Sequence, residues 1–307
     1  MRNFRFEDAE VIVLDSMPAS RDITKNSLYD IGFRRFQLTD NFDEAREMIG
    51  GGSASLMITD AFLANSSSAQ LILDIRNGKV GPDPFLPIIA LTWEPTVEIV
   101  HSIVNAGTDL MLTLPLSTGK LLSAIETVIE RRKPFVVTSA YFGPDRRTAA
   151  RIEGDSVPLI EAPNSLRRKT TNDKSGPSLE AALELVKDQR VERHVAKITF
   201  TIGQISGLGG GDTPGTLKDW LWQLHEVVVD LDERISESRY GHLSGICKSL
   251  LDVSDGIATS GSPSAADLEI LQQLALAIEV GIARDDTASV EAALDITAMV
   301  RKGTAAG

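Results

Sequence analysis

Residues 10–15 read EVIVLD, an apolar run of β-branched and leucine side chains that ends in an aspartate. A short uninterrupted run of this kind is typical of a strand that is buried on both faces of a sheet. Four similar runs follow at intervals of about 20 to 30 residues. The five runs predict five buried strands, and the later four are RRFQLT (34–39), SLMITD (55–60), LPIIALT (86–92) and DLMLTL (109–114).

Amphipathic segments separate these runs, for example residues 20–33 and 117–132. Alternation of strands and helices predicts an α/β domain whose parallel sheet is covered by helices on both faces. Ligands bind such sheets at the carboxyl ends of the strands, so Asp15 and Asp60 are candidate functional residues. In the last amphipathic segment four apolar residues share one face of the predicted helix: Leu121, Ile125, Val128 and Ile129.

The chain has 307 residues and a formal net charge of −12, so two domains are expected. Residues 134–175 carry 7 basic and 5 acidic side chains, whereas the segments on either side are acidic. Acidic surfaces repel a phosphate backbone, so we expect no DNA binding. The single Cys247 excludes an internal disulfide, and no apolar run reaches the roughly 18 residues of a membrane span. These features predict a cytoplasmic protein without a membrane span.

The order and spacing of the five runs, over about residues 8–133, resemble the receiver domain of two-component response regulators. The resemblance implies a flavodoxin-like (βα)5 fold with strand order 2-1-3-4-5 and a role in bacterial signalling. In that family the aspartate that ends the third strand accepts a phosphoryl group, and Asp60 holds this place. Asp15 matches the first of two acids that help to hold Mg²⁺. Thr92 matches the hydroxyl residue that follows the fourth strand.

Three positions depart from the family pattern. Ser16 stands in place of the second acid, Leu114 in place of a lysine, and Met111 in place of the switch aromatic. Mg²⁺ prefers carboxylate oxygens, so we expect at most weak binding by Asp15 and Asp60. Leucine can neither neutralise a phosphoryl group nor donate a hydrogen bond to it. These departures predict a pseudo-receiver, and a phosphorylatable response regulator that uses Asp60 with Mg²⁺ is the alternative.

Leu114 is followed by Pro115, where the family has a Lys-Pro dipeptide. The bond before a proline is the one common place for a cis peptide, and the resemblance implies that Leu114–Pro115 is cis. An apolar side chain at this corner suits packing better than phosphoryl chemistry. We therefore expect the fifth strand to leave the sheet as it does in receiver domains, but without the positively charged lysine that binds the phosphoryl group there.

Residues 134–177 are rich in Pro, Gly, Ser, Thr and Arg and lack a regular apolar pattern, which predicts a basic linker. Its run SLRRKTT, residues 165–171, is interpreted as a disordered tether. Another run, YFGPDRR, sets aromatic and arginine side chains beside a Gly-Pro turn and suits docking onto a neighbouring surface. A cyclic di-GMP sensor is a minor alternative, because three arginines resemble the RRxxxR element of PilZ-type domains: Arg146, Arg147 and Arg151.

Residues 178–307 show helical periodicity and predict a separate, acidic, all-α bundle of four or five antiparallel helices. The clearest apolar seam has strict 4-3-4 spacing: Leu217, Leu221, Leu224, Val228, Leu231 and Ile235. Trp222 lies off this seam and predicts a second apolar surface, for a homodimer or a protein partner.

After Ile235 the predicted helix either continues or breaks near Gly241, before Leu243. Two later seams run from Leu268 to Ile282 and from Val290 to Ile296.

Two histidines of this region are weak candidates for phosphotransfer. His242 lies in a run that loosely resembles the His-x-x-Lys-Gly of phosphotransfer bundles, but Gly245 occupies the lysine place. His225, followed by Glu226, resembles the histidine-acid pair of sensor kinases, but the residues that should follow are absent. A histidine at the surface or at a seam edge is the default interpretation of both. Cys247 is interpreted as a small core residue.

Together these features predict a non-enzymatic bacterial signalling protein with a pseudo-receiver over residues 1–133, a linker and a helical protein-interaction module. No cofactor is expected apart from weakly bound Mg²⁺.

Overall fold

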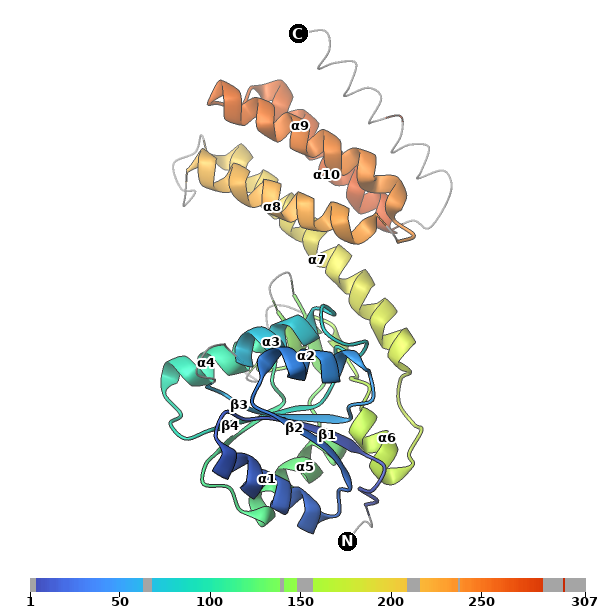
Figure 1. Cartoon of the computed structure of the whole chain (residues 1–307). Helices are drawn as coiled ribbons and strands as arrows, with labels where there is room; N and C mark the ends of the chain where they lie inside the picture. The colour runs from blue at the N-terminus through green and yellow to red at the C-terminus, as the bar shows by residue number, and fades with distance from the viewer. Residues whose placement is uncertain are drawn as a thin grey trace. The chain divides into compact units, whose positions relative to one another are not determined.

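The structure is a computed structural model that describes residues 4–62, 68–138, 141–147, 157–208, 216–236, 238–283 and 295. The chain divides into two compact units, residues 1–186 and residues 187–307. The division falls within the long helix α7, Leu179–Gly207 (Figure 1). The expected boundary near residue 133 is therefore not the limit of the first unit, which also includes the segment that was predicted to be a linker.

A five-stranded parallel sheet forms the centre of the first unit. Its strand order is β2-β1-β3-β4-β5, which confirms the flavodoxin-like order. Each strand coincides with one of the five apolar runs, because a strand covered on both faces excludes polar side chains from its interior. The strands are β1 Glu10–Leu14, β2 Arg35–Thr39, β3 Leu56–Asp60, β4 Ile88–Thr92 and β5 Leu110–Thr113.

Helices cover both faces of this sheet (Figure 1). Alternate strand residues point to opposite faces, so Val11 and Val13 pack beneath α1 and α5 while Ile12 and Leu14 pack beneath α2, α3 and α4. Side chains cap the amino ends of three of these helices and satisfy free amides there. The helices are α1 Pro18–Ile31, α2 Phe42–Gly50, α3 Ser68–Arg76, α4 Val97–Ala106 and α5 Thr118–Glu130.

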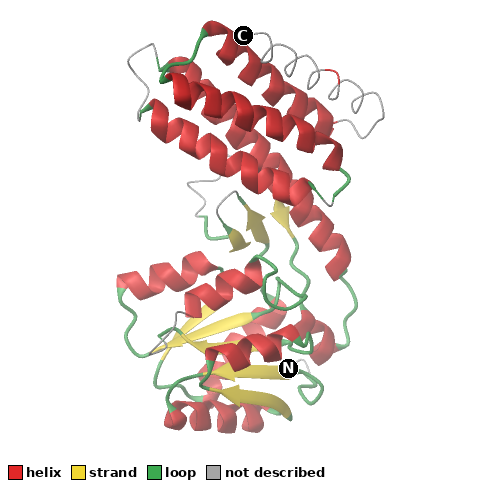
Figure 2. Cartoon of the chain, turned by 45° about the horizontal axis from the view of Figure 1, so that its top comes forward, coloured by secondary structure: helices red, strands yellow, loops and turns green. Residues whose placement is uncertain are grey.

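The described residues between 134 and 177 correct the prediction of a linker. They form a second, antiparallel sheet of order β7-β6-β8 and a short helix that contacts α5 (Figure 2). The run SLRRKTT, interpreted as a disordered tether, is that helix. A core of three phenylalanines and the first turns of α7 holds the sheet in place. The elements are β6 Phe135–Val137, β7 Phe142–Pro144, β8 Leu159–Ile160 and α6 Ser165–Thr171.

The second unit is a bundle of antiparallel helices, as the apolar seams predicted (Figure 1). The seam from Leu217 to Ile235 is α8, and its buried face packs against α9. The helix breaks near Gly241, where the backbone turns through η2, Gly241–Leu243. The last predicted seam, from Val290 to Ile296, lies outside the described residues apart from Asp295. The bundle contains the later part of α7, α8 Leu217–Ile235, α9 Ser244–Ser260 and α10 Ala265–Ala283.

Among the described helices, none has the length and apolar composition needed to cross a membrane.

Candidate functional site

The carboxyl ends of neighbouring strands bring Asp15 and Asp60 to the same edge of the sheet. β1 and β3 pair in parallel with Leu14 opposite Thr59, so the residues that follow are neighbours. Both side chains are buried, with 1% of Asp15 and 6% of Asp60 exposed. Oδ1 of Asp15 accepts a hydrogen bond from the amide of Met17 at 2.8 Å, whereas its Oδ2 is buried without a hydrogen-bond partner in the described part of the chain.

The surroundings of Asp60 shift its ionisation. Burial raises the pKa of the Asp60 carboxyl above its ordinary value, because a charge is poorly solvated inside a protein. The amide of Phe62, which donates to Oδ1 at 3.1 Å, lowers the pKa, and the charge of Asp15 raises it again. The Ser16 hydroxyl donates a hydrogen bond that lowers it. The net result is a raised pKa, so this carboxyl keeps its proton to a higher pH than a solvated aspartate.

The positions that resemble the receiver switch lie at the end of β4, within β5 and directly after β5. The buried hydroxyl of Thr92 donates to the carbonyl of Glu94 at 3.1 Å, and the amide of Leu114 donates to the carbonyl of Thr92 at 2.8 Å. The Leu114 side chain packs on the α1 and α5 side of the sheet, and Met111 packs on the opposite side. The Leu114–Pro115 peptide is cis, as the resemblance implied. An aliphatic side chain therefore stands beside the cis peptide at the end of the fifth strand.

These residues fit a metal ion poorly. No cluster of three or more His, Cys, Asp or Glu side chains that could hold a metal occurs among the described residues. Asp15 and Asp60 are two carboxylates, and Ser16 adds only a neutral hydroxyl. Mg²⁺ needs near-octahedral oxygen ligands and is usually held with carboxylates or phosphates. The unpartnered Oδ2 of Asp15 suits a cation, but the donor set fits a weakly held Mg²⁺ at most.

The arginines of YFGPDRR are bound within the first unit rather than arranged as an open phosphate site. Arg146 donates a hydrogen bond to the carbonyl of Thr108, in the loop before β5. Arg147 pairs with Asp145 at 2.9 Å. The third member of the RRxxxR resemblance, Arg151, lies outside the described residues. Guanidinium groups that already serve carbonyl and carboxylate oxygens are poorly available for phosphates, so this geometry gives the cyclic di-GMP alternative no support.

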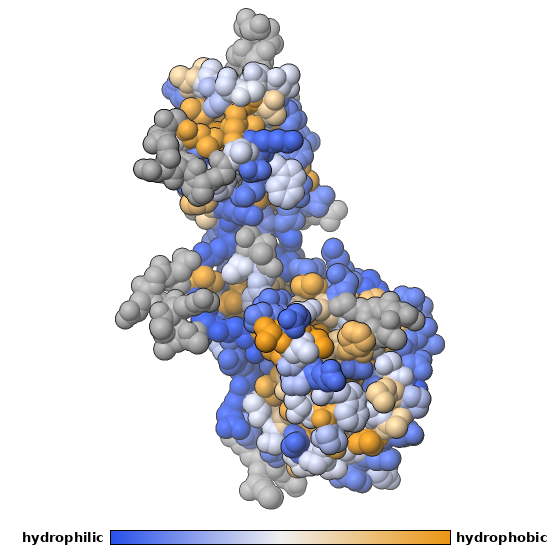
Figure 3. All heavy atoms as spheres, turned by 90° about the vertical axis from the view of Figure 1, so that its left-hand side faces the viewer, coloured by the Kyte–Doolittle hydropathy of each residue, from blue (hydrophilic) through white to orange (hydrophobic). Residues whose placement is uncertain are grey.

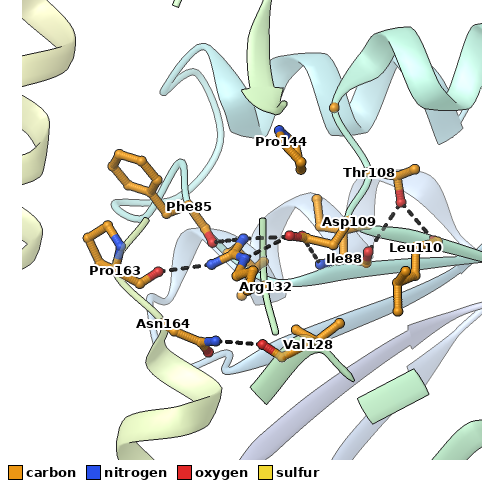
Figure 4. A network of polar contacts seen from close by, with 12 residues as sticks. Phe85, Ile88, Thr108, Asp109, Leu110, Val128, Arg132, Pro144, Pro163 and Asn164 are labelled. Atoms are coloured by element: carbon orange, nitrogen blue, oxygen red, sulfur yellow. Dashed lines mark hydrogen bonds and ion pairs between the residues drawn. The ribbon is translucent and has the colours of Figure 1, made fainter. Parts of the chain in front are cut away.

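A buried ionic network connects the receiver-like sheet to the segment that follows it, and sequence reasoning did not find it (Figure 4). Asp109 accepts hydrogen bonds from Arg132 at 2.7 Å, from Arg76 at 3.1 Å and from the amide of Ile88 at 2.9 Å. Both guanidinium groups also lie over the ring of Phe135, 4.9 and 5.2 Å from its centroid. Burial lowers the pKa of Arg76 to about 10, while the charge of Asp109 raises it. This network leaves only a weak signal in the sequence, because Asp109, Arg76 and Arg132 are far apart in the chain.

The candidate residues of the helical unit, His242, His225 and Cys247, lie in surroundings that do not favour chemistry. His242 lies in η2 with Nδ1 3.2 Å from the carbonyl of Arg239, and His225 is exposed on α8. Cys247 is buried, and burial raises its pKa to about 12, so the thiol is unreactive at neutral pH. The structure brings no partner carboxylate closer than 4.0 Å to His225 within the described residues. Neither histidine is set up for phosphotransfer by this geometry.

A different histidine, His194, forms a buried polar contact within the bundle. His194 of α7 is buried and forms a hydrogen bond to Asp230 of α8, which also pairs with Arg234 at 2.9 Å. The other ring nitrogen of His194 lies 2.6 Å from the carbonyl of Arg190. Hydrogen bonds from His194 and Arg234 lower the pKa of Asp230 although burial opposes them. This pair links α7 and α8. In the sequence, only the spacing of the neighbouring apolar residues indicates that His194 faces the core.

No protein-family model matches the chain. Curated relatives match its N-terminal part. The chemotaxis protein CheY-3 of Vibrio cholerae is 24% identical over 125 residues, which is 41% of this chain and 95% of the relative. The chemotaxis protein CheY of Pseudomonas aeruginosa is 24% identical over 122 residues, which is 40% of this chain and 97% of the relative. The first 125 or so residues match CheY-like receiver domains of response regulators.

Solved structures of receiver domains are similar to the same region. Vibrio cholerae CheY4 covers 39% of this chain, and 98% of its own chain is matched, with 21% identity and a TM-score of 0.36. A response regulator from Thermotoga maritima covers 39% of this chain and is matched over 97% of its own, with 23% identity and a TM-score of 0.35. The C-terminal part of the chain has no family match.

Proposed function

We propose that the chain is a non-enzymatic signalling protein whose receiver domain lacks a working phosphoryl switch and whose helical unit binds a protein partner or a second copy of the chain. The observation that carries this proposal is the environment of Asp60. Its carboxylate lies beside Asp15, and Leu114 turns an aliphatic side chain into the core where a receiver has a lysine.

A phosphoryl group on Asp60 would be poorly stabilised here. It would bring about two negative charges next to the buried Asp15, and phosphate oxygens are normally held by cationic or hydrogen-bond donors. Leu114 offers neither, and the Thr92 hydroxyl already donates to a main-chain carbonyl. A modification shifts an equilibrium only by its different interactions with the two states. A phosphoryl group that neither Leu114 nor Thr92 recognises is therefore expected to be a weak switch at most.

The surface of the helical unit supports a role in binding. Trp222 on α8 is 64% exposed, so it does not serve the core of its own chain. Phe200 on α7 and Leu276 and Val280 on α10 are also exposed. Large exposed apolar side chains of this kind are candidates for contact with a partner. A bundle that is acidic and partly apolar on its surface suits a protein partner better than nucleic acid.

The proposal is tested by comparing the self-association constant of the full chain with and without acetyl phosphate and Mg²⁺. We expect the constant to stay within about a factor of three, roughly 0.6 kcal/mol. The control is the Asp60→Asn chain, which cannot accept a phosphoryl group. A tenfold shift in the original chain that is absent from Asp60→Asn would mean that the receiver is a working switch.

A phosphorylatable response regulator is the second candidate function. The observation in its favour is that Asp15 and Asp60 lie at the carboxyl ends of neighbouring strands, with Thr92 at the end of the next strand. Mass spectrometry after treatment with acetyl phosphate measures the extent to which Asp60 is phosphorylated. Stoichiometric Mg²⁺-dependent labelling of Asp60 supports this candidate, whereas a trace of label that is independent of Mg²⁺ supports the pseudo-receiver.

A further inference from the structure

We propose that the segment after α10 folds back along this helix within the same chain and covers an apolar face of α7 and α10. The face is defined by three exposed side chains, Phe200 on α7 and Leu276 and Val280 on α10. The segment is residues 284–302, of which the structure describes Asp295. The inference goes beyond the proposed function, because a contact within one chain narrows the surface that is left for a partner.

The apolar face lies on two neighbouring helices. Phe200 and Leu276 are each 59% exposed, and Val280 is 38% exposed. The hydroxyl of Thr199 on α7 donates to the carboxylate of Glu279 on α10 at 2.7 Å, so the two helices lie side by side. Hydrophobic residues are visible at the surface of the helical unit in Figure 3. Large apolar side chains on adjoining helices indicate a surface that another apolar segment covers.

The segment after α10 has the sequence pattern of a helix with one apolar stripe. Val290 and Leu294 are four residues apart, and Arg301 follows seven residues after Leu294. Steps of four and seven residues return to nearly the same face of a helix, which has about 3.6 residues per turn. Asp295 is helical and exposed. Its position is more than a quarter turn away from the stripe, so its exposure agrees with a stripe that faces the bundle.

The exposed face of α10 repeats the same spacing in the opposite direction. It has one apolar residue, a second four residues earlier in the chain, and an exposed acidic residue seven residues before that. An antiparallel alignment sets apolar residues of the segment beside apolar residues of α10, and a basic residue beside the acidic one. The pairs are Val290 with Val280, Leu294 with Leu276, and Arg301 with Glu269. Opposite charges at one end of an apolar contact fix its register.

The short connection to α10 favours the segment of the same chain over a second copy. Six residues, RDDTAS, separate the end of α10 at Ala283 from Val290. Connections of about 2 to 8 residues are usual between neighbouring helices of a bundle, and polar or small residues are typical of them. A tethered segment also has a higher effective concentration at its site than a free molecule. The face does not include Trp222 of α8, which remains exposed for a partner.

The test introduces two cysteines into the full chain and oxidises it with copper phenanthroline in air. Gln273→Cys and Thr297→Cys face each other in the proposed alignment and leave its three pairs intact. The control joins Gln273→Cys with Asp295→Cys, because residue 295 points away from α10. A disulfide needs Cα atoms about 4.4 to 6.8 Å apart, so we expect the first pair to cross-link within one chain at least tenfold faster than the control. The native Cys247 is buried and does not compete.

Leu294→Glu, added to the first cysteine pair, should slow the cross-link at least tenfold, because it sets a charge against Leu276. Ala292→Glu, on the opposite side of the segment, should leave the rate nearly unchanged. Equal rates for the two cysteine pairs, or no effect of Leu294→Glu, would overturn the inference. A disulfide that joins two chains, seen as a dimer on a non-reducing gel, would also overturn it, because a second copy then covers the face. The proposed function is judged separately by the response to acetyl phosphate.

Discussion

At the scale of the residue, an aliphatic side chain stands at Leu114, where the receiver pattern has a lysine. Leu114 occupies the end of the fifth strand with a side chain that packs into the core. Asp60 is buried beside Asp15 and has no ion-pair partner among the described residues. Burial of an unpaired charge is unfavourable, and the raised pKa of Asp60 records that penalty.

The raised pKa of Asp60 predicts how stability depends on pH. The folded chain holds the proton of Asp60 to a higher pH than the unfolded chain does. The original chain therefore loses stability as the pH rises from the pKa of Asp60 in the unfolded chain through its pKa in the folded chain. Asp60→Asn removes this loss and keeps an acceptor for the amide of Phe62. We expect Asp60→Asn to have a higher free energy of unfolding in urea at pH 7.5 than the original chain.

Asp60→Asn should change the free energy of unfolding little at a pH below the pKa of Asp60 in the unfolded chain, because Asp60 is then protonated in both states. Asp43→Asn in the exposed first turn of α2 is a suitable comparison, because it removes a carboxylate from a solvated position. If Asp60→Asn is destabilising at pH 7.5, the carboxylate has a stabilising partner and the site is not short of positive charge.

At the scale of the element, the small sheet β6, β7 and β8 belongs to the first unit. The rings of Phe85, Phe135 and Phe142 pack together with centroids 5.2 to 5.4 Å apart. Gly143 allows β7 to approach closely, since a Cβ there would lie 2.9 Å from the Cα of Gly107. This close packing explains why a segment poor in apolar residues still folds.

Phe135→Ala should release the small sheet from the first unit. The side chain is fully buried, and removal of a buried phenylalanine costs about 3 to 5 kcal/mol through lost contacts and the cavity left behind. It also removes the ring that lies against Arg76 and Arg132. Hydrogen exchange of residues 134–137 and 141–147 in the full chain should speed up strongly.

Leu159→Ala in β8 is the matched control, because that side chain is 53% exposed and its loss should cost less than about 1 kcal/mol. Equal protection of the small sheet in both variants would mean that the segment acts as a linker after all, held without help from the phenylalanine core.

At the scale of the whole molecule, the chain joins two units of different construction. One is a receiver-like α/β unit in which polar networks connect distant segments, and the other is a bundle held by helical seams and the buried pair of His194 and Asp230. The exposed apolar side chains of the bundle remain outside both cores. The bundle is therefore the part of the molecule that we expect to associate.

Trp222→Glu should weaken self-association of the full chain. Exposed tryptophans at interfaces often carry about 2 kcal/mol or more of binding energy, which corresponds to roughly a 30-fold change in the dissociation constant. Sedimentation equilibrium measures this change. Ala258→Glu adds the same charge at an exposed position of α9 and should leave the constant nearly unaltered. A full chain that is monomeric at high concentration, or an equal effect of both variants, would contradict the prediction.

The sequence by itself determined the elements with a strong local period. Runs such as EVIVLD and the seam from Leu217 to Ile235 repeat over neighbouring residues, so they predicted the strands of the sheet and the helices of the bundle. The positions of Asp15 and Asp60 at strand ends followed from the same pattern, since parallel strands share one carboxyl edge. The strand order came from the resemblance to receiver domains and is confirmed.

Only the tertiary structure decided the features built from distant residues. Asp109 meets Arg76 and Arg132 across separations of 33 and 23 residues, and no local period marks such contacts. Strands of two or three residues are too short to show alternation, so the sequence of β6, β7 and β8 predicts a linker instead. Burial supplies the physical reason: a charged or aromatic side chain reveals its role only when the partners that surround it are brought together by the fold.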